Sequence, residues 1–137
     1  MEHPAVEPGV KRFRCLIADD SAFARKNIAG IVAKLGGDVV GEASNGVDAV
    51  ALYAEHSPDL VLLDITMPQM DGVETLQRII EKDKNAKVII VSSIGHKEMV
   101  WKAISLGAKS FLTKPLKADY AALVITDVMR GGNGGTR

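Results

Sequence analysis

The sequence predicts a single-domain α/β protein with a doubly wound, five-stranded parallel sheet and helices on both faces. Apolar runs of strand length alternate along the 137 residues with helix-length segments of different periodicity. The runs at 59–64 and 87–92 are apolar without alternation, which is typical of parallel strands covered on both faces. A chain of this length is also long enough to bury one hydrophobic core.

The first predicted strand covers residues 13–19 and leads directly into a helix. Asp20 or Ser21 caps this helix, since either side chain can accept a hydrogen bond from its first N–H groups. The apolar positions of the helix recur at i, i+3, i+4 and i+7, namely Ile28, Ile31, Val32 and Leu35. The pair Gly36-Gly37 ends the helix, because a left-handed C-cap favours glycine.

The rest of the chain continues the same alternation. The other strands are predicted at 38–43, 59–64, 87–92 and 109–113. The other helices are predicted to start at the Asn45-Gly46 turn and at Gly72, and to cover 96–106 and 117–130. Residues 13–130 therefore form the domain, with flexible ends expected at 1–12 and at the Gly-rich segment 131–137.

Composition excludes several classes of protein. The 17 Lys and Arg residues balance the 17 Asp and Glu residues, so the basic excess of a direct nucleic-acid binder is missing. The single cysteine, Cys15, excludes an internal disulfide framework and favours a reducing compartment. No apolar run approaches the ~20 residues needed for membrane insertion, and the polar N-terminus is no signal peptide. We therefore expect a cytoplasmic protein.

Polar residues gather where the predicted strands end. Asp19-Asp20 follow the first strand, Asp64 ends the third, Ser92 ends the fourth and Lys114 follows the fifth. Ligands of doubly wound sheets bind outside the carboxyl ends of the strands. Each residue alone is more often a cap or a solvated side chain, but together they predict one acidic, phosphate-sized pocket.

Three converging carboxylates would repel one another unless a hard cation lay among them. Mg²⁺ suits carboxylate and water ligands, with Mn²⁺ as the alternative. A carboxylate beside such an ion can act as a nucleophile toward phosphorus, which is the role we predict for Asp64. Lys114 and the Ser92 hydroxyl would then contact the phosphoryl oxygens.

The chain resembles the receiver domain of bacterial two-component response regulators, and it looks closest to the single-domain chemotaxis type. The resemblance covers residues 12–130 and rests on Asp19-Asp20, the segment Asp59-Leu-Val-Leu-Leu-Asp-Ile-Thr-Met-Pro-Gln-Met-Asp-Gly72, Ser92, Phe111 and Lys114-Pro115. It implies a flavodoxin-like sheet with strand order 2-1-3-4-5, of which this family is itself a standard example.

The resemblance also implies residue roles. Asp64 would accept phosphate from a sensor histidine kinase or a phosphotransfer protein. Asp20 would ligate Mg²⁺ directly and Asp19 mainly through water, and the backbone carbonyl of Thr66 would complete the protein ligands. Ser92 would contact the phosphoryl group together with Lys114.

Phe111 would form the switch with Ser92, the hydroxyl moving toward the phosphate while the ring turns inward. Core packing is the simpler role for an aromatic residue in a short final strand. The family often has tyrosine at this position, and phenylalanine lacks its hydroxyl. Thr66 and Ile94 would flank the path of attacking water. Because neither is an acid, a base or a water-positioning amide, we expect slow to intermediate loss of the phosphoryl group.

The helix at 96–106 is apolar around more than half of its circumference. Heavy burial is one explanation, and the last helix has similarly many apolar residues. The interpretation we favour is a docking face for a downstream protein target, or for a phosphorylation-linked homodimer, formed by Val100, Trp101, Ile104 and Phe111.

Three alternatives stay open. The chain could be the receiver module of a larger response regulator rather than a free-standing regulator. An aspartate-nucleophile phosphatase would place a second acid where this chain has Thr66, so we expect a phosphoacceptor rather than a turnover enzyme. A flavin carrier would need a hydroxyl- and glycine-rich phosphate loop where this chain has Asp19-Asp20. We favour the free-standing regulator, with chemotaxis as its pathway.

Overall fold

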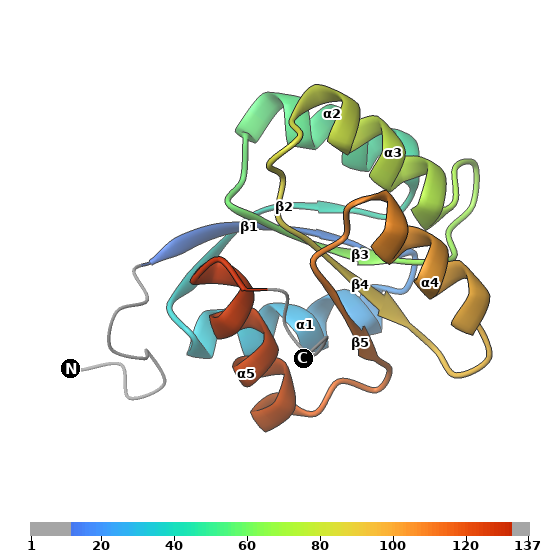
Figure 1. The fold of residues 1–137 in the computed structure, drawn as a ribbon. Coiled ribbons are helices and arrows are strands. Elements are labelled where there is room, and N and C mark those ends of the chain that lie inside the picture. Colours follow the sequence, from blue (N-terminus) through green and yellow to red (C-terminus); the bar gives the residue numbers. More distant parts are fainter. Residues whose placement is uncertain (1–11, 133–137) are drawn as a thin grey trace.

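The computed structural model describes residues 12–132, in which five strands and five helices alternate (Figure 1). Residues 1–11 and 133–137 lie outside this range, and with them most of the two terminal segments predicted to be flexible. The elements in chain order are β1 (Phe13–Ala18), α1 (Ala22–Lys34), β2 (Gly37–Ala43), α2 (Gly46–His56), β3 (Leu60–Asp64), α3 (Gly72–Lys82), β4 (Val88–Ser92), α4 (Lys97–Leu106), β5 (Ser110–Thr113) and α5 (Ala118–Met129). Within 12–132, no helix combines the length and the apolar character needed to cross a bilayer.

The sheet has the order β2-β1-β3-β4-β5, and every neighbouring pair is parallel. This confirms the predicted fold class and strand order. In Figure 1, α1 and α5 cover one face of the sheet, and α2, α3 and α4 cover the other. Each observed strand starts and ends within one residue of its prediction. The order places β1 and β3 side by side at the centre, so their carboxyl ends lie together.

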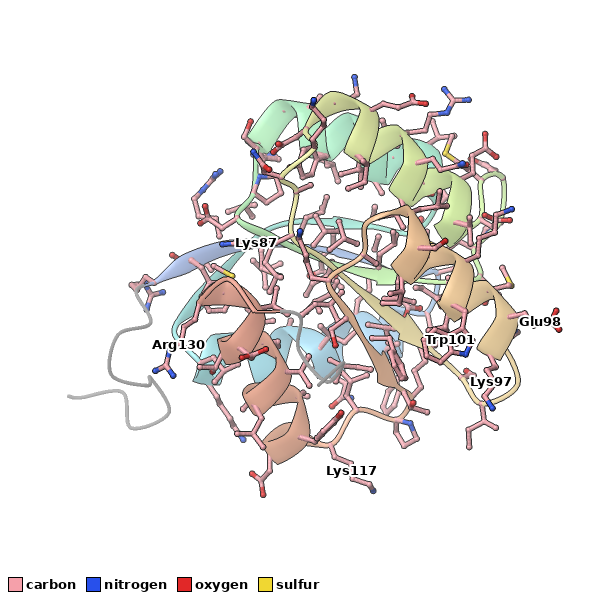
Figure 2. The ribbon with its side chains drawn as sticks, viewed as in Figure 1. Lys87, Lys97, Glu98, Trp101, Lys117 and Arg130 are labelled. Atoms are coloured by element: carbon pink, nitrogen blue, oxygen red, sulfur yellow. The ribbon has the colours of Figure 1, made fainter. Side chains whose placement is uncertain are left out.

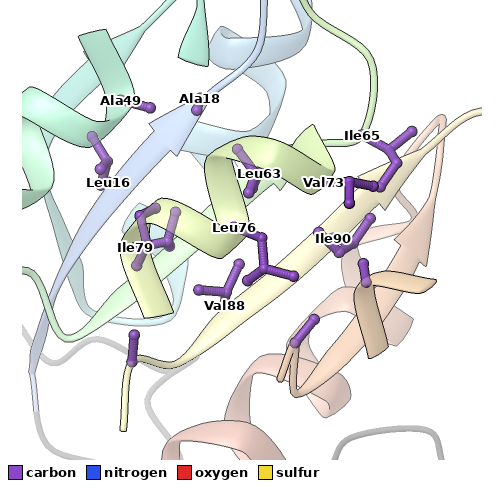
Figure 3. Packing of buried hydrophobic residues seen from close by; sticks show 14 of the residues in the cluster. Leu16, Ala18, Ala49, Leu63, Ile65, Val73, Leu76, Ile79, Val88 and Ile90 are labelled. Atoms are coloured by element: carbon purple, nitrogen blue, oxygen red, sulfur yellow. The ribbon is translucent and has the colours of Figure 1, made fainter. Parts of the chain in front are cut away.

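Side-chain alternation along the central strands fills a separate core on each face of the sheet. Leu16, Val61, Leu63, Val88 and Ile90 pack under α2, α3 and α4, where Leu76 and Ile79 of α3 lie over the strands (Figure 3). Cys15, Ile17, Leu62, Ile89 and Val91 point the other way and pack with α1 and α5. The fully apolar runs of β3 and β4 therefore reflect burial on both faces, as predicted.

The ends of α1 resolve one open prediction and correct another. Ser21, not Asp20, is the N-cap, and its side chain accepts a hydrogen bond from the Ala24 N–H. Asp20 therefore remains available to the acidic site. Gly36 has the left-handed φ of 87° expected of a C-cap residue. Gly37 is not part of the cap: it begins β2, where an added Cβ would lie 2.6 Å from Val32 and would not fit.

The segment between β3 and α3 folds tightly against the end of β3. The Gly72 N–H donates to the Ile65 carbonyl at 2.8 Å, and a Cβ on Gly72 would lie 2.3 Å from the Asp64 carbonyl oxygen. Asp71 caps α3 by accepting a hydrogen bond from the Glu74 N–H. Glycine at position 72 thus allows α3 to start directly beside Asp64.

Candidate functional site

The three predicted carboxylates lie together at the carboxyl edge of the sheet. One ligand oxygen each from Asp19, Asp20 and Asp64 lies within 4.8 Å of the others. Asp19 and Asp64 are buried, whereas Asp20 is exposed. The pairing of β1 with β3 brings the three residues together, since Asp19-Asp20 follow β1 and Asp64 ends β3.

Both carboxylate oxygens of Asp19 have a partner in the structure. Its Oδ1 accepts a hydrogen bond from the Ser21 N–H at 2.9 Å. Its Oδ2 is also buried, and the Lys114 ammonium lies 2.7 Å from it, at the distance of a charge-assisted hydrogen bond. Three clustered carboxylates with one ammonium group beside them carry an excess of negative charge, which a bound cation would offset. The residues present therefore fit a hard divalent ion such as Mg²⁺.

Lys114 is the cation that the acidic cluster holds in the structure. Its Nζ lies 2.7 Å from Asp19 Oδ2 and 3.5 Å from Asp64 Oδ2. Burial alone would lower the pKa of Lys114, but the Asp19 and Asp64 carboxylates outweigh it and raise the pKa above its ordinary value. The ammonium group therefore stays charged beside the Asp19 and Asp64 carboxylates.

The surroundings of Asp64 raise the pKa of its carboxyl group. Burial and then the Asp19 charge raise its pKa to about 6 from 3.8, with a smaller contribution from Asp20. The Lys114 charge and the Thr66 N–H, which donates to Oδ1 at 3.3 Å, oppose this rise. A cation bound among the three carboxylates would favour the ionised, nucleophilic form.

Ser92 and Lys114 approach the site from neighbouring strands. Ser92 is buried at the end of β4, pairs with Thr113 of β5, and accepts a hydrogen bond at its carbonyl from the Lys114 N–H at 2.8 Å. The Ser92 hydroxyl donates to the Ser93 carbonyl at 2.9 Å. Around the pocket, Thr66 and Ile94 are both exposed, Ile94 to 88%.

Three residues of the predicted partner face, Val100, Trp101 and Phe111, line a groove of about 180 Å³ between α4 and β5 that also includes Ser92. Trp101 and Phe111, 60% and 37% exposed, form its accessible side, and Figure 2 shows Trp101 on α4. Val100 is only 8% exposed because it packs in the core under α4, although it also lines the groove. Ile104 is half-buried and packs against the same core.

One exposed residue near the site was missed by the sequence analysis. Phe23, at the start of α1, is 84% exposed and lines a second pocket together with Lys114 and Pro115. A signal was available, because Phe23 lies about 130° from the centre of the apolar face of α1 at 100° per residue. In α5 the heavy-burial explanation holds for Val124, Ile125 and Val128, which are buried.

Comparison with known proteins is consistent with this geometry. The response regulator receiver domain family matches residues 15–126. The chemotaxis protein CheY of Bacillus subtilis is 52% identical over 106 residues, which cover 77% of this chain and 88% of that protein. CheY of Thermotoga maritima is 47% identical over 117 residues, which cover 85% of this chain and 98% of that protein.

Solved structures show the same relationship. The crystal structure of the CheX–CheY–BeF3–Mg²⁺ complex from Borrelia burgdorferi aligns with a TM-score of 0.80 and 36% identity. That alignment covers 95% of this chain and 97% of the other. The fold, the acidic cluster at the carboxyl edge of the sheet and the matched sequences lead to one conclusion: this chain belongs to the response regulator receiver domain family.

Proposed function

We propose that the protein is a phosphorylation-activated signalling switch whose phosphoacceptor is Asp64. The observation that supports this best is the buried Asp64 carboxylate, placed within 4.8 Å of two further acidic groups and 3.5 Å from the Lys114 ammonium. Such a site combines a nucleophile, a place for a divalent ion and a cation for the transferred group. The donor would be a sensor histidine kinase or a phosphotransfer protein.

In the transfer, an Asp64 carboxylate oxygen attacks the phosphorus of a phosphohistidine. An O–P bond forms as the N–P bond breaks, and the electron pair returns to the imidazole nitrogen. The Lys114 ammonium and the Ser92 hydroxyl bind the phosphoryl oxygens in this arrangement. Asp19, Asp20, Asp64 and the Thr66 carbonyl would hold Mg²⁺, which neutralises negative charge on the phosphoryl group when bound.

The presence of Mg²⁺ in the Borrelia CheX–CheY complex supports this choice of ion. Mn²⁺ would serve as a substitute, because it also prefers carboxylate and water oxygens. Both ions would enter at Asp20, the exposed member of the cluster.

The signal would pass through Ser92 and Phe111, because both line the groove that Trp101 also lines. For the Ser92 hydroxyl to reach a phosphoryl oxygen, it must leave the Ser93 carbonyl that it now contacts. Space vacated on that side would admit the half-exposed Phe111 ring. The groove would then change shape for a downstream protein or for a second, phosphorylated copy, since a ligand of one state shifts a two-state equilibrium.

We place this switch in a chemotaxis pathway, because relatives of 47–52% identity are CheY proteins. The single reduced cysteine favours the cytoplasm. A receiver module of a larger regulator would use the same chemistry. Thr66, where a phosphatase would have a second acid, favours acceptance of phosphate without turnover of small esters. Thr66 and the exposed Ile94 also favour slow to intermediate hydrolysis, and a half-life of seconds without a phosphatase would contradict that.

Phosphorylation by acetyl phosphate with Mg²⁺, followed by intact mass spectrometry, tests the proposed function. We expect one phosphoryl adduct on the wild-type protein, and none after chelation of the metal or in Asp64→Asn. An adduct that persists in Asp64→Asn would exclude Asp64 as the acceptor. Continuous release of phosphate from small esters would instead favour the phosphatase.

A further inference from the structure

Arg25 of α1 reaches from its helix to the backbone of the acidic site. Its Nη1 donates a hydrogen bond to the Asp19 carbonyl oxygen at 2.6 Å. Its Nε donates to Glu42 Oε1 of β2 at 3.0 Å. The Arg25 side chain is mostly buried, with 20% of its surface exposed. One guanidinium therefore ties α1 and β2 to the residue that follows β1.

Arg25 contacts the Asp19 carbonyl just beyond the end of the hydrogen-bonded ladder between β1 and β2. The Asp19 N–H still donates to the Ala43 carbonyl, at 2.9 Å, but β2 ends at that residue. In a parallel ladder, the next donor to the Asp19 carbonyl would be the N–H two residues beyond Ala43. That residue, Asn45, is the N-cap of α2. The Arg25 guanidinium supplies a donor to Asp19 at this point.

The carbonyl that Arg25 holds belongs to the peptide between two predicted metal ligands. A rotation of the Asp19–Asp20 peptide plane would swing the Asp20 side chain relative to Asp19. Asp20 is the exposed ligand of the cluster, so burial constrains its direction less than it constrains Asp19 or Asp64. A fixed peptide plane therefore helps to determine where its carboxylate points.

We infer that Arg25 is a positioning residue for the divalent-ion site, and that it acts by fixing the Asp19–Asp20 peptide. This inference rests on the proposed function, because it assumes that the acidic cluster binds the ion. The Glu42 carboxylate orients the Arg25 guanidinium. It also offsets the positive charge of the guanidinium, which by itself would oppose binding of a nearby cation.

Positioning and simple electrostatics predict opposite results when the charge of Arg25 is removed. Loss of a nearby positive charge alone would strengthen binding of a divalent cation. Loss of the peptide contact would weaken it, and removal of such outer contacts typically reduces metal affinity 10–100-fold. The sign of the change in Arg25→Gln therefore distinguishes the two.

The test measures metal affinity directly, without phosphorylation. Free Mn²⁺ is followed by its electron paramagnetic resonance signal during titration of the protein, and Mg²⁺ affinity is obtained by competition. We expect Arg25→Gln to weaken both ions by about tenfold. Arg25→Lys should fall between it and the wild type, because one ammonium cannot reproduce the forked contact. Lys26→Gln, an equal charge change at an exposed position of the same helix, should keep wild-type affinity.

Urea unfolding without metal separates positioning from a purely structural role. If Arg25 only stabilised the fold, Arg25→Gln would lower the free energy of unfolding and leave the Mn²⁺ dissociation constant unchanged. Metal binding by Arg25→Gln that is as tight as in the wild type, or tighter, would overturn this inference but not the proposed function. If Arg25→Gln does not fold, Arg25→Lys decides, and wild-type affinity there overturns the inference. A wild-type protein that binds neither ion would overturn the proposed metal site, and the inference with it.

Discussion

Replacing Asp64 with asparagine should stabilise the metal-free protein at neutral pH. The Asp64 carboxylate is 3% exposed and lies beside Asp19 and Asp20, and these surroundings raise its pKa to about 6 from 3.8. The folded protein therefore opposes ionisation of this group. Asparagine has nearly the same shape and carries no charge, so it relieves that opposition.

The size and the pH dependence of the effect follow from the pKa. A rise from 3.8 to about 6 corresponds to about 3 kcal/mol. Because the folded protein binds this proton more tightly than the unfolded chain does, the associated stability is fully present below 3.8 and is lost as the pH rises through about 6. Asp64→Asn should thus match the wild type below about pH 4 and exceed it by about 3 kcal/mol at about pH 7.5.

Urea unfolding, followed by circular dichroism in the presence of a chelator across this pH range, measures the difference. Glu81→Gln, the same kind of substitution at an exposed position, should stay within about 0.5 kcal/mol of the wild type at every pH. Saturating Mg²⁺ should stabilise the wild type more than Asp64→Asn and so shrink the gap. Equal stability of Asp64→Asn and the wild type at neutral pH would refute the reasoning. A difference in the free energy of unfolding that stays the same at every pH would also refute it.

Three further outcomes test the site and its surroundings. Lys114→Met should destabilise the metal-free protein at neutral pH by about 1–3 kcal/mol in urea unfolding, because it leaves the buried carboxylate of Asp64 without its nearby cation; unchanged stability would contradict this. Gly72→Ala should cost about 2–3 kcal/mol in the same assay because its Cβ would lie 2.3 Å from a carbonyl oxygen, whereas Gly30→Ala in the open middle of α1 should gain about 0.5–1 kcal/mol. Trp101 fluorescence should change on phosphorylation with acetyl phosphate and Mg²⁺, and a constant signal would argue against movement at its groove.

Much of the site could be predicted because each of its residues ends a strand or comes shortly after one. Asp64 and Ser92 are the last residues of β3 and β4, and Asp19 and Lys114 come directly after β1 and β5. Parallel strands align their carboxyl ends along one edge of the sheet, so residues far apart in sequence meet there without further information. The cap of α1 was harder, because Asp20 and Ser21 have similar capping preferences and only the backbone shows which one accepts the Ala24 N–H.

The sequence by itself determined the α/β class, the strand bounds to within one residue and the acidic pocket, because local periodicity and the geometry of parallel sheets dictate them. Tertiary structure alone decided which apolar residues of α4 face outward: Val100 is buried and its neighbour Trp101 is exposed. It also decided that Arg25 reaches the Asp19 carbonyl. A helical pattern gives relative positions around the axis, but how the helix is rotated against the sheet depends on packing with residues distant in the chain.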